Sequence, residues 1–194
     1  MFITETIIRP VDCVVAFAIP LNKSSIRRNQ RLNPIADFSK HIVWPLYQID
    51  TINPMKFLKS GRSIGFQIKE EFSYSDLSDF FTSGKKVLIL FAHWSNGRVE
   101  LFDGFHCADD FLNVFPEDGR FIVDLNVCTC KELGETLGIS RPNSIIKHSN
   151  LNIPSYAGAW CIFYRYFFQL LDEQKLTYLE GLQVSGKEFK NIFK

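Results

Sequence analysis

The sequence predicts an α/β fold in which helices cover both faces of a mostly parallel sheet. Two short apolar runs, Val87 to Ala92 and Phe121 to Val127, have the length and the β-branched residues of buried parallel strands. A third run, Ser63 to Lys69, alternates as a strand, and a serine-capped helix from Ser73 to Gly84 follows it. Strand, helix and strand in succession indicate a parallel βαβ unit.

Length and composition favour one globular domain over residues 1–194. The chain has 194 residues, 46% of them hydrophobic, and a formal net charge of +1. Such a chain can bury a full core, and a charge near zero gives no argument for nucleic-acid binding. Five irregularly spaced cysteines favour a reducing, cytoplasmic location over a disulfide framework. No apolar run reaches 18 residues and no signal peptide is recognisable, so no membrane association is expected.

The N-terminal part, residues 1–62, gives fewer signals. Cys13 to Ile19 is an apolar run that Pro20 stops, which predicts a central first strand. A basic group follows without an intervening acid and is either a solvated loop or a site for an anionic substrate or partner; it comprises Lys23, Arg27, Arg28 and Arg31.

Three prolines then argue against any long helix. Asp37 to Tyr47 is expected to form a short amphipathic helix that is broken before Pro45, and His41 and Trp44 within it are expected to pack rather than to do chemistry. The residues that interrupt the helical pattern are Pro34, Pro45 and Pro54.

The C-terminal half alternates turns, short strands and helices. Asn96-Gly97 and Asp103-Gly104 are turn sequences on either side of a short hairpin strand. A nearly all-round apolar helix is expected from Pro154 to about Leu171, and it is either buried on several sides or meets a partner. The remaining expected elements are the hairpin strand Arg98 to Phe102, helix Ala108 to Phe115, helix Cys130 to Leu137 closed by Gly138, strand Asn143 to His148, and helix Leu176 to Phe193.

The predicted strands Val87 to Ala92 and Phe121 to Val127 each run directly into a reactive side chain. The first is followed by His93 and the second by Cys128. Ligands of open α/β sheets sit outside the carboxyl ends of the strands, so the two side chains are expected to face one crevice. An imidazole beside a thiol can take its proton or stabilise the thiolate, which favours acyl transfer. The helix expected after Cys128 would favour the thiolate through its N-terminal N–H groups. A simple buried cysteine is the alternative.

Asp124 lies in the middle of the second strand. A carboxylate in a buried strand must be paired or hydrogen-bonded, so Asp124 is either structural or lines a pocket.

Four segments taken as a set carry a resemblance to a known family. They are YSDLSDFFTSGKKVLILFAHW, VELFDGF, VDLNVC, and GAWCIFYRYFFQLLDEQKLTYLEGL, with SIIKHSNLNI lying between the last two. They resemble the CHAT domain, a caspase-like cysteine peptidase domain related to separases, caspases and gingipains. The resemblance covers roughly Ser63 to Val184, and residues 63–194 match better than residues 1–62.

The resemblance implies a caspase-like three-layer sandwich and a Cys-His dyad without cofactor or metal. His93 matches the family histidine and Cys128 the nucleophile, while Cys130 lies two positions too late. The family uses the backbone N–H groups of the cysteine and of a glycine after the histidine to stabilise the oxyanion; here that second position is Trp94, which tolerates positive φ poorly. Asp124 is a candidate for substrate selection.

The expected function is that of a cysteine endopeptidase acting on a protein or peptide. By analogy with CHAT-like domains, a regulatory partner protein and a prokaryotic defence system are expected settings. The alternative is a non-catalytic relative that binds a peptide or partner in the same crevice, which Trp94 and the aromatic helix favour. A metal site using His106-Cys107 and Cys128-x-Cys130 is a third interpretation, but the C-x-C spacing suits structural zinc poorly.

Overall fold

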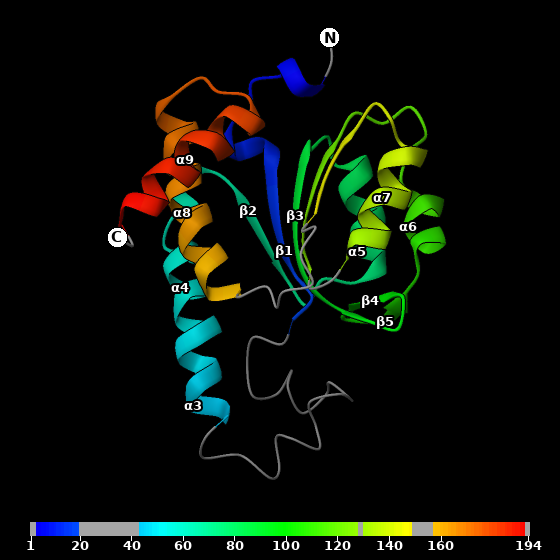
Figure 1. The fold of residues 1–194 in the computed structure, drawn as a ribbon, viewed down its shortest axis with the longest axis horizontal. Helices are drawn as coiled ribbons and strands as arrows, with labels where there is room; N and C mark the ends of the chain where they lie inside the picture. The colour runs from blue at the N-terminus through cyan, green and yellow to red at the C-terminus, as the bar shows by residue number, and fades with distance from the viewer. Residues whose placement is uncertain (1–2, 20–42, 128–129, 149–156, 193–194) are drawn as a thin grey trace.

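The computed structural model describes residues 3–19, 43–127, 130–148 and 157–192. Its described part is an α/β structure in which seven α-helices surround a seven-stranded sheet. The sheet stands between two helical layers: α3, α4, α8 and α9 cover one face, and α5, α6 and α7 cover the other (Figure 1). The predicted α/β class and the helices on both faces are therefore confirmed.

Five strands run parallel in the spatial order β2-β1-β3-β6-β7. Two more strands, β4 and β5, pair antiparallel with β3 and with each other. The strands are β1 (Cys13–Phe17), β2 (Gln67–Glu70), β3 (Val87–Ser95), β4 (Arg98–Leu101), β5 (Gly104–His106), β6 (Ile122–Val127) and β7 (Ile145–His148).

The sheet is thus mixed, and the expectation of a mostly parallel sheet is corrected. The physical reason is the turn at Asn96 and Gly97, whose φ values of 52° and 75° are those of a type I′ hairpin turn. The turn sends the chain back beside β3, which continues through His93 to Ser95 instead of ending before it.

The helices begin where the sequence supplies caps. Helix α5 starts with the expected capping box, because Ser73 and Asp76 bond each other's backbone N–H groups. Helix α7 runs past Gly138 to Ser140, so that glycine does not close it as expected. The helices are α3 (Val43–Tyr47), α4 (Asn53–Lys59), α5 (Tyr74–Thr82), α6 (Ala108–Val114), α7 (Lys131–Ser140), α8 (Ala157–Glu173) and α9 (Tyr178–Ile192).

The segment from Val43 to Lys59 is helical throughout, contrary to the expectation that prolines interrupt it. A π-type turn, η3 (Gln48–Ile52), joins α3 to α4, and the residues at both junctions have α-helical backbone angles. Pro54 lies in the first turn of α4, where the missing N–H costs least. The expectations for Lys23, Arg27, Arg28, Arg31 and His41 fall outside the described residues.

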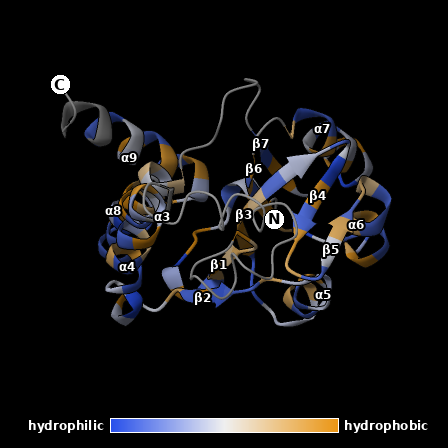
Figure 2. Cartoon of the chain, turned by 90° about the horizontal axis from the view of Figure 1, so that it is seen from below, coloured by the Kyte–Doolittle hydropathy of each residue, from blue (hydrophilic) through white to orange (hydrophobic). Residues whose placement is uncertain are grey.

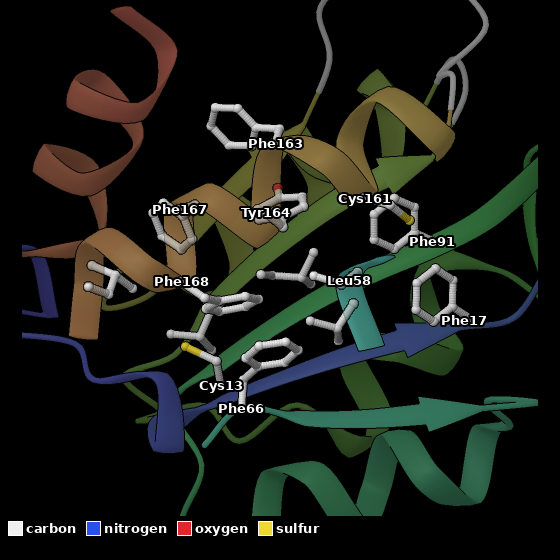
Figure 3. Packing of buried hydrophobic residues seen from close by; sticks show 14 of the residues in the cluster. Cys13, Phe17, Leu58, Phe66, Phe91, Cys161, Phe163, Tyr164, Phe167 and Phe168 are labelled. Carbon is white, nitrogen blue, oxygen red and sulfur yellow. The ribbon is translucent and has the colours of Figure 1, made fainter. Parts of the chain in front are cut away.

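The alternating residues of the strands divide the core into two clusters. One cluster, here the α8-side core, includes Phe17 and Phe91, whose rings stack at 4.8 Å, together with residues of α4 and α8 (Figure 3). The other cluster, the α7-side core, includes Leu88, Leu90 and Ala92 of β3 with residues of α5, α6 and α7. Within the described residues, no helix is both long and apolar enough to cross a membrane.

Candidate functional site at the carboxyl edge of the sheet

The carboxyl ends of β1, β3 and β6 lie at one edge of the sheet, which Figure 2 views end-on between the two helical layers. Among the described residues, the last Cα pair of the parallel β3–β6 ladder is Ala92 with Val127. His93 is the next residue of β3, and Val127 is the last described residue before Cys128. Cys128 lies outside the described residues, so its pairing with His93 stays a prediction.

His93 is half-buried and belongs to the α8-side face of the sheet. Side chains of a strand alternate between faces, and Val87, Ile89 and Phe91 all point into the α8-side core. His93 continues this series by two residues. On β6 the same face carries Ile122, in the α8-side core, and Asp124 and Asn126, which hydrogen-bond Tyr164 of α8.

The side chain of Trp94 points to the opposite face and packs partly buried against the α7-side core. Trp94 lies in a regular strand, and within the described part of the chain only Glu71 and Asn96 are non-glycine residues with positive φ. The concern that tryptophan would have to adopt positive φ after the histidine therefore does not arise in this structure.

The backbone N–H of Trp94 is directed toward the edge where β6 lies. In β3, the Phe91 carbonyl accepts from Ala18 on the β1 side, whereas the Lys86 carbonyl accepts from Ile122 on the β6 side. The N–H and C=O of one residue share an edge and alternate along a strand, so even-numbered residues of β3, including Trp94, face β6.

The hairpin geometry leads to the same conclusion. A two-residue type I′ turn closes on a hydrogen-bonded pair, here Ser95 and Arg98. The next pair, Trp94 and Val99, is then a non-hydrogen-bonded pair whose N–H groups point away from each other. The N–H of Trp94 is directed away from β4.

Asp124 is completely buried and is surrounded by donors. Its Oδ2 accepts from the Tyr164 hydroxyl at 2.6 Å and from the Tyr178 hydroxyl at 2.7 Å. Its Oδ1 accepts from Lys147 Nζ at 2.8 Å and from Asn126 Nδ2 at 3.3 Å. The carboxylate thus joins β6 to β7, α8 and α9, and these hydrogen bonds offset the cost of burying its charge.

The same cluster changes the pKa values of the two tyrosine hydroxyls. Burial, and next the negative charge of Asp124, raises the pKa of Tyr164 well above its ordinary value, and the same two causes raise the pKa of Tyr178. Lys147 also lies over the Trp160 ring, 4.9 Å from its centroid. Of the two interpretations of Asp124, the structural one fits these contacts, and a role in substrate selection stays a prediction.

Glu100 is a buried acid that sequence reasoning missed. It lies in β4 with 8% of its surface exposed, directly opposite His93. Its neighbours Val99 and Leu101 point into the α7-side core, so Glu100 faces the other way, as His93 does. The signal was an acid between two apolar residues of a strand, the same signal that singled out Asp124.

The described cysteines are buried or partly buried thiols. Cys130 is completely buried in the α7-side core just before α7, on the face opposite His93. Cys107 precedes α6, and its neighbour His106 stacks on Tyr74 at 4.8 Å between ring centroids. No cluster of three or more potential metal ligands occurs among the residues that the structure describes.

No protein-family model matches the chain, and neither a curated protein nor a solved structure matches it.

Proposed function

We propose that the chain is a cysteine endopeptidase in which His93 and Cys128 form the catalytic dyad at the carboxyl edge of the sheet. The observation that carries the proposal is the register of β3 with β6. The Ala92–Val127 pair places the residues immediately before His93 and Cys128 side by side in neighbouring parallel strands. Carboxyl ends of such strands are where α/β proteins bind ligands.

The proposed reaction has two halves. His93 accepts the thiol proton of Cys128, and the thiolate sulfur attacks the carbonyl carbon of the scissile peptide. The imidazolium then protonates the leaving amine, which leaves an acyl-enzyme. In the second half, His93 takes a proton from water and the resulting hydroxide attacks the thioester carbon. The C–S bond then breaks, the imidazolium returns the proton to the Cys128 sulfur, and the carboxylic acid is released.

The direction of the Trp94 N–H supports a role as one of two oxyanion donors, with the N–H of Cys128 as the other. An N–H that points from β3 toward the β6 edge faces the side on which the nucleophile follows β6. Loss of one such donor in other enzymes costs about 10²–10³ in rate. A backbone donor has the advantage that the tryptophan side chain, packed on the other face, does not obstruct it.

The caspase-like CHAT resemblance extends the proposal to its setting. The helices on both faces of a sheet, a hairpin after the histidine strand and a late aromatic helix are consistent with it. We therefore include a regulatory partner protein in a cytoplasmic prokaryotic defence system as part of the proposal. If the isolated chain cuts many unrelated proteins at full rate, regulation by a partner is refuted.

The test is incubation of the chain with a peptide library, using wild type, Cys128→Ala and Cys107→Ala. We expect wild type and Cys107→Ala to cut the same peptides and Cys128→Ala to cut none, because Cys107 is a thiol at the start of α6 outside the dyad. Cleavage by Cys128→Ala at the wild-type rate would refute the proposal. So would the absence of cleavage in all three together with no preferential alkylation of Cys128 below pH 7.

A second candidate function is a non-catalytic module that binds a peptide or partner at the same edge. The departure from the family glycine at Trp94 suggested this candidate from the sequence; in the structure, the aromatic residues of α8 favour it, of which Tyr166 is 42% exposed. Full biological function in the Cys128→Ala protein would establish it over the peptidase.

A further inference from the structure

The side of α8 that faces away from the sheet carries apolar, polar and charged residues. Helix α8 belongs to the layer on the far side of the sheet from α5, α6 and α7 (Figure 1). Its buried residues, such as Tyr164 and Phe167, pack in the α8-side core. Steps of about 100° per residue place the remaining ones together on the opposite side of the helix. This outer stripe of α8 consists of exposed or half-buried residues, namely Ile162, Arg165, Tyr166, Gln169, Asp172 and Glu173.

Arg165 lies near one end of the outer stripe and has no partner for its charge. Its Nε and Nη1 atoms are buried and donate no hydrogen bond, and Arg165 forms no ion pair within the described part of the chain. The guanidinium lies 5.8 Å from the centroid of the Phe57 ring and so close to Gly61 that a Cβ there would be 2.7 Å from Nε. Buried donors without acceptors cost free energy, so an acceptor supplied from outside would be stabilising.

Two acids lie at the other end of the outer stripe. Asp172 and Glu173 are exposed in the last turn of α8, and neither forms an ion pair with another described residue. Acids are poorly placed at a helix C-terminus, where the dipole favours cations. Arg165, Gln169 and Glu173 are spaced four residues apart, so they form one ridge along the helix. The unpaired cation and the unpaired acids are thus about 10–12 Å apart along the helix axis.

The surface between the charged ends is apolar and aromatic. Tyr166 and Phe57 of α4 are each 42% exposed, and their ring centroids lie 6.3 Å apart. Ile162 is half-buried one turn before Tyr166. An aromatic centre with charged residues around it is the composition typical of a protein–protein interface.

The outer stripe is complementary to itself. When α8 of a second copy packs antiparallel on it, with a twofold axis at Gln169, Arg165 of each copy lies opposite Asp172 and Glu173 of the other. Helix axes 8–10 Å apart leave a distance that arginine and glutamate side chains can span. A twofold axis repeats every contact, so both sets of ion pairs form together. A parallel arrangement would instead place Arg165 opposite its own equivalent, which like-charge repulsion disfavours.

We propose that the outer stripe of α8 is a self-association surface through which two copies of the chain form an antiparallel, twofold-symmetric dimer. The charges identify a second copy as the occupant, because the stripe itself supplies both the cation and the acids that the contact needs. The aromatic pair of Tyr166 and Phe57 lies between them and becomes covered. The surface belongs to the outer side of the helical layer and not to the carboxyl edge of the sheet (Figure 2). The inference therefore does not depend on the proposed peptidase activity.

Sedimentation velocity over a range of protein concentrations tests the proposal with the full chain. We expect a dimer whose Kd rises at least about 100-fold in Arg165→Glu, because one reversal creates like-charge contacts at two symmetric places. Asp172→Arg together with Glu173→Arg should weaken the dimer as strongly. All three substitutions in one chain restore both sets of opposite charges and should restore the dimer. The matched control is Lys131→Glu, the same change of charge at an exposed site on α7 in the opposite layer, which should leave Kd unchanged.

A wild-type chain that stays monomeric overturns the inference. So does a dimer that neither reversal weakens, or one that the combined substitutions fail to restore. Circular dichroism checks the fold of each variant. If Arg165→Glu does not fold, the exposed pair Asp172→Arg and Glu173→Arg decides the test alone.

Crosslinking tests the antiparallel arrangement separately. Gln169 lies at the proposed twofold axis, so Gln169→Cys should be linked to its own equivalent by a short bifunctional maleimide much faster than Gln183→Cys, an exposed glutamine of α9. The wild-type chain, which has the same native cysteines, gives the background. A dimeric Gln169→Cys protein that links no faster than Gln183→Cys overturns the proposed arrangement.

Discussion

The hydroxyl of Tyr178 in α9 donates a 2.7 Å hydrogen bond to Asp124 at the centre of the sheet. Tyr164 of α8 donates to the same carboxylate oxygen at 2.6 Å. Two helices of one layer are thereby connected to β6, the strand that precedes Cys128. The strand is fixed by polar contacts as well as by apolar packing.

Removing one of these donors should destabilise the protein measurably. We expect Tyr178→Phe to lower the free energy of unfolding by about 1.5–3 kcal/mol, the usual range for a hydrogen bond to a charged group. Tyr166→Phe, on the exposed side of α8, should change it by less than about 0.5 kcal/mol. Urea unfolding of both variants measures the difference, and equal values would contradict a stabilising role for the cluster.

Alkaline pH should unfold the protein by acting on the same tyrosines. Their pKa values are raised in the folded state, so above the ordinary pKa of about 10 the unfolded chain loses protons that the folded chain keeps. Stability is therefore full below pH 10 and falls as pH rises, by up to about 1.4 kcal/mol per pH unit for each tyrosine. Urea unfolding at pH 8 to 11 measures this fall in stability, which should be less steep in Tyr178→Phe. An equally steep fall would contradict the conclusion that Tyr178 contributes to the loss of stability at alkaline pH.

Replacing two glycines of α7 by alanine should change the stability of the protein in opposite directions. A Cβ on Gly134 would lie 2.2 Å from Cδ2 of His148 in β7, so Gly134→Ala should cost about 1–3 kcal/mol through overpacking. Nothing lies within 4 Å of a Cβ on Gly138, and Gly138→Ala should stabilise the helix by up to about 1 kcal/mol. Thermal unfolding distinguishes the two, and a stabilised Gly134→Ala would mean that α7 and β7 are not so closely packed.

The capping box of α5 gives an acid-dependent prediction. Burial alone would raise the pKa of Asp76, but its bonds to Lys69 and Ser73 outweigh burial and the pKa is lowered. The stabilisation is therefore present above the ordinary pKa of about 3.9 and is lost as pH falls through the lowered value. Asp76→Asn should reduce stability by about 1 kcal/mol at pH 7 and by less near pH 2.

The control for that prediction is Asp79→Asn, an exposed residue of the same helix, which should have little effect at either pH. Urea unfolding at pH 7 and at acid pH measures both variants. If Asp76→Asn lowered the free energy of unfolding equally at both pH values, the predicted pH dependence of this stabilisation would be contradicted.

Local signals in the sequence accounted for most strands and helices. The apolar runs around Leu90 and Leu125 are buried strands because each has both faces covered, and the Ser73 cap marked the start of α5. Such features depend on neighbours in the chain. Pro54 was misjudged because its effect depends on the π-type turn before it, which lets one helical segment continue through a residue that usually ends one.

The candidate site was less accessible to sequence reasoning because it depends on register. The strand ending at His93 was expected, but its extension to Ser95 and the pairing of His93 with Glu100 follow from the type I′ turn. A shift by one residue would have turned Glu100 to the α7-side core. Asp124 was recognised as a buried acid that needs partners, whereas Tyr164 and Tyr178, 40 and 54 residues away, could not be identified as those partners from spacing.

The attachment of α9 to the sheet through Tyr178 bears on how shortened versions of the chain should be designed. A version that stops before Tyr178 would lose a donor to a carboxylate that has no access to water, and would uncover the apolar face of α8 that Tyr178 covers through Phe167. Affinity tags are therefore better appended beyond the last helix than substituted for it.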